Sequence, residues 1–213
     1  MDSKKQKNVF LNIEGDKWFE RNKKVLEQRD INEDYLLKQI LEFVPNLNNS
    51  NTLLEIGCGD GSRLSALKKN KYTVFGIDPS KSAIKDAVSN GVNAFVGTAD
   101  KLPFEDNKFE IVSFGFCLYL CDREDLFKIA AEADRVLKKG GYLFILDFYS
   151  KIPISNDYHH REGLKSYKMD YSKLFEWHPD YVLVKKTIGS HDNIQKQTDN
   201  LNDWISISIL RKL

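Results

Sequence analysis

At 213 residues the chain is long enough to bury one large core and short for two domains. Its content of 41% hydrophobic and 30% charged residues is ordinary for a soluble globular protein. Because 32 basic residues stand against 31 acidic ones, the formal net charge is only +1, and no global field favours nucleic acid or anionic lipid as a partner.

The start of the chain and its cysteines indicate a cytoplasmic protein without a membrane segment. The first residues, MDSKKQKNVFLNIEGD, lack the apolar core of a signal peptide. The longest apolar run, at 112–121, is about half the ~20 residues that span a bilayer. Cys58, Cys117 and Cys121 are odd in number, and CLYLC matches neither a CxxC redox pair nor a usual zinc knuckle, so we expect three reduced thiols.

The N-terminal region predicts two helices. Apolar residues recur at three-to-four spacing over 16–28 and again over 32–44. Pro45 and the polar run NLNNSN after it are expected to end the second helix.

From residue 52 the pattern alternates between strand and helix. Strands are expected at 52–56, 72–78, 92–97, 109–118 and 142–148, with helices at 61–70, 79–90 and 123–139. The long helix is expected to end at Gly140-Gly141. Such alternation with short turns predicts a parallel, doubly wound sheet.

The last 65 residues break this rhythm. Strands at 181–189 and 204–210 are joined by a short polar connection, so they are expected to pair antiparallel. The fold class is therefore α/β, a doubly wound, seven-stranded, mostly parallel sheet with a C-terminal antiparallel hairpin. We expect a single domain over 1–213, divided into an N-terminal helical cover (1–45), a cofactor-binding core (50–148), a substrate cover (149–180) and the hairpin (181–213).

The first strand of this sheet runs into LLEIGCGDG, with glycine at 57, 59 and 61. Glycines between a strand and a helix N-terminus let a ligand lie against the backbone. Asp78 ends the second strand, where a carboxylate can accept hydrogen bonds from both hydroxyls of a ribose. These residues predict an adenosine-type ligand.

The acids beside the turn narrow the choice of ligand. A dinucleotide fingerprint, G-x-G-x-x-G, would need glycine at position 62, which is Ser62. Glu55 and Asp60 bracket the turn, and two acids suit a ligand that carries positive charge, such as an ammonium and a sulfonium.

Four segments in this order resemble the class I S-adenosylmethionine-dependent methyltransferases. They are LLEIGCGDG (53–61), VFGIDPS (74–80), GTADKLPFEDNKFEIVSF (97–114) and DRVLKKGGYLFI (134–145). The resemblance implies the methyltransferase sheet, S-adenosylmethionine as cofactor, Asp78 in the ribose position and Asp100 in the position that meets the exocyclic amine of adenine. The cofactor-binding residues that we expect are Arg21, Glu55, Gly57, Cys58, Gly59, Gly61, Asp78, Pro79, Ala99, Asp100, Lys101 and Phe116.

Each of these residues also has a purely structural interpretation. The three glycines could permit a tight turn, Asp78 could cap the helix that begins near Pro79, and Asp100 could be a turn residue. For none of these residues to bind a ligand, all three structural explanations would have to hold at once, at positions that match the family's segments in their order.

Two segments could cover the acceptor site. The first, FLNIEGDKWFERN (10–22), is similar to the N-terminal helix that folds over the cofactor in such enzymes, and Arg21 could reach the carboxylate of the methionine moiety. The alternative is an amphipathic helix that merely packs on the sheet.

The second segment, 147–179, holds three of the four histidines and several tyrosines. A neutral histidine can take a proton from a hydroxyl near pH 7, so His159 and His160 are the expected catalytic base, although either could be structural. The expected substrate-binding residues are Tyr119, Tyr149, Tyr158 and Arg161, which would suit a polyhydroxylated acceptor. No spaced set of acids completes a metal site, so no metal is expected.

The stretch SFGFCLYL (113–120) lacks the Asn/Asp-Pro-Pro-aromatic turn of methyltransferases that act on nucleobases, which argues against a nucleic-acid substrate. The tail 157–181 looks similar to small bacterial methyltransferases linked to surface-glycan or nucleotide-sugar modification. The expected reaction is methyl transfer to a hydroxyl of a small sugar-like molecule. A non-catalytic cofactor-binding or scaffold protein and a nicotinamide-dependent oxidoreductase remain as alternatives.

Overall fold

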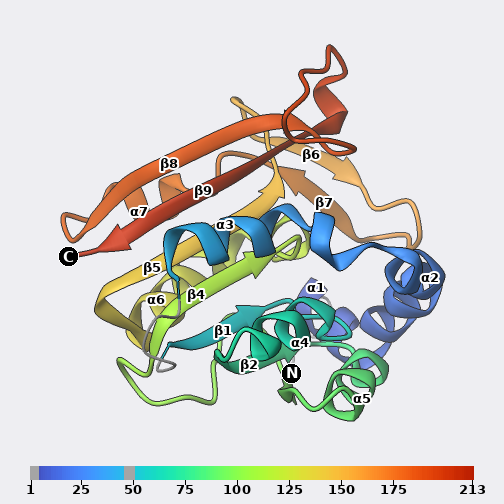
Figure 1. The fold of residues 1–213 in the computed structure, drawn as a ribbon. Helices are drawn as coiled ribbons and strands as arrows, with labels where there is room; N and C mark the ends of the chain where they lie inside the picture. Colours follow the sequence, from blue (N-terminus) through green and yellow to red (C-terminus); the bar gives the residue numbers. More distant parts are fainter. Residues whose placement is uncertain (1–4, 46–50) are drawn as a thin grey trace.

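A seven-stranded sheet organises the computed structural model, which describes residues 5–45 and 51–213 (Figure 1). The strand order is β3-β2-β1-β4-β5-β9-β8. The strands are β1 (Thr52–Ile56), β2 (Thr73–Asp78), β3 (Asn93–Val96), β4 (Phe109–Gly115), β5 (Leu137–Phe148), β8 (Tyr181–Ser190) and β9 (Trp204–Lys212). The expected seven-stranded α/β architecture is confirmed.

The strands joined by crossover connections pair in parallel, whereas the last two strands form an antiparallel hairpin. β1 to β5 pair in parallel, each joined to the next by a crossover. β9 pairs antiparallel with β5, Phe144 opposite Ile209, and β8 pairs antiparallel with β9. The expected C-terminal hairpin is therefore present, and it extends the sheet beyond β5.

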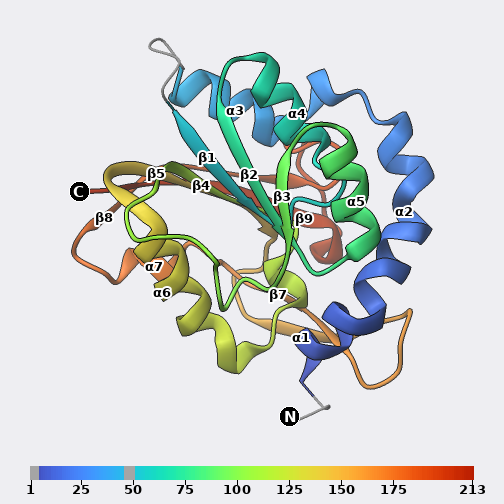
Figure 2. The same cartoon turned by 90° about the horizontal axis from the view of Figure 1, so that it is seen from below.

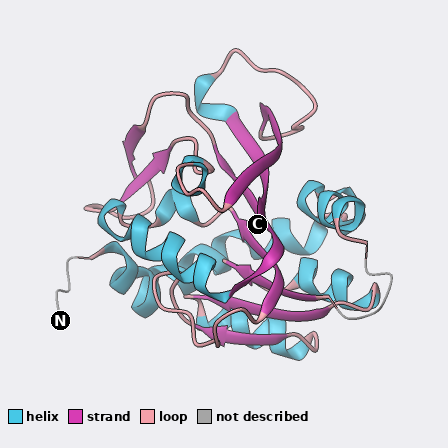
Figure 3. Cartoon of the chain, turned by 90° about the vertical axis from the view of Figure 1, so that its left-hand side faces the viewer, coloured by secondary structure: helices cyan, strands magenta, loops and turns pink. Residues whose placement is uncertain are grey.

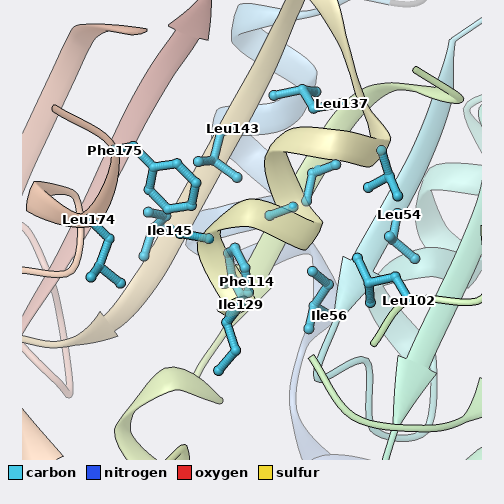
Figure 4. Packing of buried hydrophobic residues seen from close by; sticks show 14 of the residues in the cluster. Leu54, Ile56, Leu102, Phe114, Ile129, Leu137, Leu143, Ile145, Leu174 and Phe175 are labelled. Carbon is cyan, nitrogen blue, oxygen red and sulfur yellow. The ribbon is translucent and has the colours of Figure 1, made fainter. Parts of the chain in front are cut away.

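Helices cover both faces of the sheet (Figures 2 and 3). α6 (Leu126–Val136) and α7 (Lys173–Glu176) lie on one face, while α3 (Tyr35–Phe43), α4 (Ser62–Lys69) and α5 (Lys81–Ser89) lie on the other. β4 is apolar on both sides because Val112 and Phe114 pack under α6, whereas Ile111 packs in the opposite cluster. Figure 4 shows Phe114 beside Ile129 of α6.

The N-terminal helical cover lies beside the sheet and meets the segment that follows β5. It comprises α1 (Gln6–Val9), a π-helical turn (Phe10–Glu14), α2 (Gly15–Gln28) and a 3₁₀ turn (Ile31–Glu33) before α3. Between β5 and β8 a separate hairpin forms from β6 (Ile154–Asp157) and β7 (Lys165–Lys168). Phe10, Tyr158 and Leu164 are buried together, so the two covers share a small apolar cluster.

Three predicted boundaries were wrong. The long helix predicted over 123–139 begins with a 3₁₀ turn at 123–125. It ends at Val136, because the backbone becomes extended at Leu137, whose side chain is buried in the core. Gly140-Gly141 lies within β5 and permits a bulge there, with Gly140 at φ 77°. β4 ends at Gly115, before the predicted 118, and the second N-terminal helix begins at Tyr35.

The polar run predicted to follow Pro45 lies largely outside the described residues, at 46–50. Among the helices that the structure describes, none combines the length and apolar character needed to cross a membrane. Cys58, Cys117 and Cys121 are all free thiols.

Replacing Phe114 by alanine should lower the free energy of unfolding by about 3–5 kcal/mol, because it opens a cavity at a fully buried position. Urea unfolding followed by circular dichroism measures this change. Phe127→Ala is the matched control, since that side chain is 72% exposed and its loss should change the free energy by less than about 0.5 kcal/mol. Equal losses for the two variants would contradict the core assignment.

Candidate active site

A large cavity opens at the carboxyl ends of β1, β2 and β4, with a volume of about 1690 Å³. Its walls come from the β1–α4 turn, the end of β2, the loop after β3, the ends of β4 and β5, the N-terminal cover, the β6–β7 hairpin and the β8–β9 loop. This is the edge where a parallel doubly wound sheet binds ligands.

The β1–α4 turn is built on left-handed glycines. Gly57, Gly59 and Gly61 have φ of 79°, 53° and 69°, which other residues adopt only with strain. A side chain at Gly57 would meet the Cys117 Cβ at 2.5 Å, whereas one at Gly59 would meet no described atom within 4 Å. Gly57 is thus required by packing, while Gly59 leaves a bare stretch of backbone on the cavity wall.

Asp78 ends β2 beside the glycine turn and also lines the cavity. Its carboxylate accepts the N–H of Gly59 at 3.0 Å and that of Ser80 at 2.8 Å, so it is oriented by both neighbouring turns. Burial raises the pKa of Asp78 to about 6, although these two N–H groups oppose the shift. The cap of α5 is supplied by Ser80, which accepts the N–H of Ala83 at 3.0 Å.

Glu55 lines the cavity from β1 and is almost completely buried. One of its oxygens, Oε1, is bound by Arg63 of α4. The other, Oε2, is buried and has no hydrogen-bond partner among the described residues. A residue of the cavity lining therefore carries a buried carboxylate oxygen that lacks a donor among the described residues.

Asp100, in the loop after β3, is held by lysines. Lys7 Nζ lies 2.6 Å from its Oδ2, and Lys128 Nζ lies 3.3 Å from the same atom. Burial acts to raise the pKa of Asp100, but the hydrogen bonds from Lys7, Thr98 and Lys128 outweigh it and lower the pKa to about 2. Asp100 therefore fastens α1 across this side of the cavity, an interaction that no local pattern predicts.

The start of α2 packs directly on the turn after Asp78. An added Cβ at Gly15 would lie 2.7 Å from the carbonyl oxygen of Phe10 and 3.1 Å from the backbone nitrogen of Ser80, so a larger residue would force the backbone to shift. Asp16 accepts hydrogen bonds from Ser80 Oγ at 2.8 Å and from the N–H of Ser82 at 2.9 Å. The N-terminal helix thus lies against the end of β2, as a cover of the cavity would.

Arg21 faces the second cover. It donates to Glu14 Oε1 at 2.6 Å and to the Tyr158 hydroxyl at 3.0 Å, and Arg161 Nη1 lies 3.9 Å from Glu14 Oε2. Glu14 is only 1% exposed, so this group of charges ties α2 to the loop after β6.

The histidine pair belongs to the second cover and reaches the cavity. His159 and His160 both line the cavity, and the His160 ring packs edge-on against Tyr158 at 5.4 Å. His178 packs against Trp177 and Tyr181 instead, and Tyr149 stacks on Trp204. Among the described residues no three His, Cys, Asp or Glu side chains converge as a metal site.

An aromatic group that was not anticipated lies at the ends of β4 and β5. His191 of the β8–β9 loop stacks on Phe148 at 5.4 Å and 14°, and Phe116 meets both rings. Phe116 has φ 54°, an uncommon conformation for this residue type that turns the chain at the end of β4. Lys168 Nζ lies 4.9 Å from the centre of the Phe148 ring, and burial lowers the pKa of that lysine.

The structure brings most of the expected residues onto one cavity. The lining contains Glu55, Gly57, Cys58, Gly59, Asp78, Pro79, Ala99, Asp100, Phe116, Tyr119, Tyr158, His159 and His160. The others lie behind or beside it: Gly61 packs on Ala87 and Val92, Lys101 is exposed, and Arg21, Tyr149 and Arg161 have the partners described above. Lys7, Phe148, Lys168 and His191 also line the cavity and were missed, because no local motif marks these residues and the fold brings them together from distant segments.

Comparison with known proteins agrees with this geometry. Residues 54–145 match the model of a methyltransferase domain. A ubiquinone/menaquinone biosynthesis C-methyltransferase of Desulfotalea psychrophila is 38% identical over 98 residues, which are 44% of this chain and 39% of that protein. An uncharacterized methyltransferase of Bacillus subtilis is 31% identical over 106 residues, which are 46% of this chain and 41% of that protein. The chain thus spans less than half the length of these two relatives.

Solved structures share the fold. A Burkholderia thailandensis 1,6-didemethyltoxoflavin-N1-methyltransferase, with 1,6-didemethyltoxoflavin and S-adenosylhomocysteine bound, superposes with a TM-score of 0.69 at 12% identity, over 92% of this chain and 84% of that one. The YcgJ protein of Bacillus subtilis has a TM-score of 0.61 at 16% identity, over 84% of this chain and 99% of that one. At such identities the likeness shows a common fold.

Asp122→Ala should loosen α1 over the cavity. The Asp122 carboxylate accepts the N–H of Gln6 at 3.1 Å and that of Lys7 at 3.0 Å, so its loss removes two charge-assisted bonds. We expect trypsin to cut after Lys7 roughly tenfold faster or more, since each such bond is worth about 1.5–3 kcal/mol. Asp106→Ala, which breaks an exposed ion pair with Arg135, is the control. Equal cutting rates in the two variants would show that Asp122 does not hold the segment.

Proposed function

We infer that this chain, which belongs to the class I S-adenosylmethionine-dependent methyltransferases through residues 54–145, transfers a methyl group from that cofactor to a small polar acceptor. The observation that carries the inference is the meeting of three features on one cavity. They are the bare backbone at Gly59, the carboxylate of Asp78 and the unpartnered oxygen of Glu55.

These features fit the parts of S-adenosylmethionine. The Asp78 carboxylate would accept both ribose hydroxyls, the Gly57–Gly61 turn would lie against the sugar and the amino-acid chain, and Glu55 would accept the ammonium. Bound there, the cofactor would supply a sulfonium methyl, which the acceptor atom would attack in line while the carbon–sulfur bond breaks and S-adenosylhomocysteine leaves as a neutral thioether. The protein's part is to hold the reacting atoms in line and to exclude water, and such positioning can lower the barrier by roughly 7–11 kcal/mol.

We propose that the acceptor is a hydroxyl of a sugar or a related metabolite. In support, His159 and His160 line the cavity beside Tyr158, and a neutral histidine can take the proton that the hydroxyl must lose. Tyr119, which also lines the cavity, would add a hydrogen bond to a polyhydroxylated molecule. None of the relatives described above is named for a glycan, so this choice depends on the side chains alone.

The aromatic group of Phe116, Phe148 and His191 favours a second candidate, a flat-ring acceptor. Aromatic side chains pair with planar rings through offset or edge contacts. The Desulfotalea relative is named for quinone biosynthesis, and quinones are flat rings. In that case the ring would enter beside β5 and the β8–β9 loop, away from the histidine pair.

Asp78→Asn should weaken binding of S-adenosylmethionine about 10- to 100-fold, because one charge-assisted acceptor of the ribose is lost. Calorimetric titration measures the affinity, with Asp106→Asn as the control for loss of an exposed negative charge. Tight binding of NAD without binding of S-adenosylmethionine would overturn the proposed function in favour of an oxidoreductase. Cofactor binding without a methyl increment in any acceptor class tested would indicate a binding or scaffold protein.

His159→Ala and His160→Ala test the proposed base. With sugar-type acceptors screened by mass spectrometry for a methyl increment, loss of the base should lower turnover by roughly 10²- to 10⁴-fold in one of the two variants. His178→Ala serves as the control, since that ring packs against Trp177 and Tyr181. Full turnover in both variants would reject the histidine pair as the base.

A further inference from the structure

A chain of buried charges links the N-terminal cover to the glycine turn. Asp34 stands at the N-terminus of α3, where its Oδ1 accepts the N–H of Leu37 at 2.8 Å. Arg63 projects from α4, and Glu55 from β1. All three residues are at most 8% exposed, so their mutual contacts are screened little by water.

Arg63 divides its donors unequally between the two acids. It binds Asp34 with two parallel bonds, Nε to Oδ1 at 2.9 Å and Nη2 to Oδ2 at 2.8 Å. Only Nη1 reaches Glu55, at Oε1. The two-bond fork fixes the plane of the guanidinium, and that plane in turn fixes Glu55.

Gly115 at the end of β4 leaves room for this arrangement. A Cβ there would lie 2.8 Å from Arg63 Nη1 and 3.0 Å from Glu55 Oε1. Arg63 holds Oε1 of the Glu55 carboxylate in this way. The other oxygen, Oε2, has no partner among the described residues, and Glu55 lines the cavity. A buried carboxylate oxygen without a donor is costly unless a ligand supplies one.

We propose that Asp34 and Arg63 are positioning residues for the cofactor's amino-acid end: they hold Glu55 so that its free Oε2 accepts the ammonium group. The proposal rests on the proposed function, because it assumes that S-adenosylmethionine and its product occupy this cavity. It also gives the start of α3, a part of the N-terminal cover, a direct role in cofactor binding.

The charges around Glu55 shift its pKa, and this shift makes ligand binding at Glu55 measurable as proton release. Burial raises the pKa of Glu55 to about 7; Arg63 and, more weakly, Arg29 oppose the shift, while Asp34 adds to it. The thiols of Cys58 and Cys117 also lie near and stay neutral, since burial raises the pKa of each. Near pH 7 Glu55 is thus about half protonated, and an ammonium that favours the ionised form must displace a proton.

The experiment compares S-adenosylhomocysteine with 5′-methylthioadenosine, which lacks the amino-acid end. Calorimetry at pH 7 in buffers of different ionisation enthalpy counts the protons released. Asp78 contributes equally to both ligands, since both carry the ribose, so the difference reports Glu55. We expect about half a proton more for S-adenosylhomocysteine, and a preference for it over methylthioadenosine that grows from pH 6 to pH 8.

Two variants test the residues. Glu55→Gln should lose the extra proton release and weaken S-adenosylhomocysteine about 10- to 100-fold while methylthioadenosine binds as before. Asp34→Asn keeps a good helix cap but removes the negative charge that raises the pKa of Glu55. It should reduce the extra proton release and flatten the pH dependence of the preference, a change that a merely structural role of Asp34 would not cause.

The outcomes separate this proposal from the proposed function. If neither ligand binds the unaltered protein, the proposed function fails. If both bind but Glu55→Gln keeps the preference for S-adenosylhomocysteine, or Asp34→Asn releases as many protons as the unaltered protein, the positioning role is wrong and the proposed function stands. Thermal unfolding of each variant confirms that it is folded, and unchanged methylthioadenosine affinity confirms that the cavity is intact.

Discussion

The position of β1 between β2 and β4 is the constraint on which the site depends. Parallel pairing of β1 with both neighbours brings three strand ends to one edge, and the chain leaves that edge in different directions on either side of β1. Glu55, the glycine turn and Asp78 meet there because they terminate adjacent strands. The apolar alternation that builds the sheet thereby also places the polar groups of the cavity.

The sheet and its covers are held by different forces. The two faces of the sheet are closed by large apolar clusters, and α3 takes part in one of them through Leu36 and Ile40. By contrast, α1 and α2 are fastened to other segments by polar contacts such as Lys7 to Asp100 and Arg21 to the Tyr158 hydroxyl, with a small apolar cluster around Phe10 and Tyr158. Displacing α1 and α2 alone would therefore break these contacts without opening the two main apolar clusters, so we expect this part of the molecule to open locally before the sheet does.

The sequence was sufficient for the sheet and for the glycine turn and Asp78 at its edge because both are encoded locally. Strand 52–56, its glycines and Asp78 follow one another within about one βαβ unit, so spacing alone aligns them. The end of the long helix was misjudged because Gly140-Gly141 resembles a helix stop, while burial of Leu137 had already drawn the chain into β5. Tertiary packing overrode the local pattern there.

The acceptor side could not be predicted in the same way because it is assembled from distant segments. Lys7, Phe148, Lys168 and His191 come from the N-terminal cover, β5, β7 and the β8–β9 loop, and each is ordinary in its own neighbourhood. Their chemistry appears only once the sheet has brought the segments together. Under the proposed function, the edge at β1 and β2 would hold the cofactor whatever the covers are, and the segments that meet only in the folded chain would decide the acceptor.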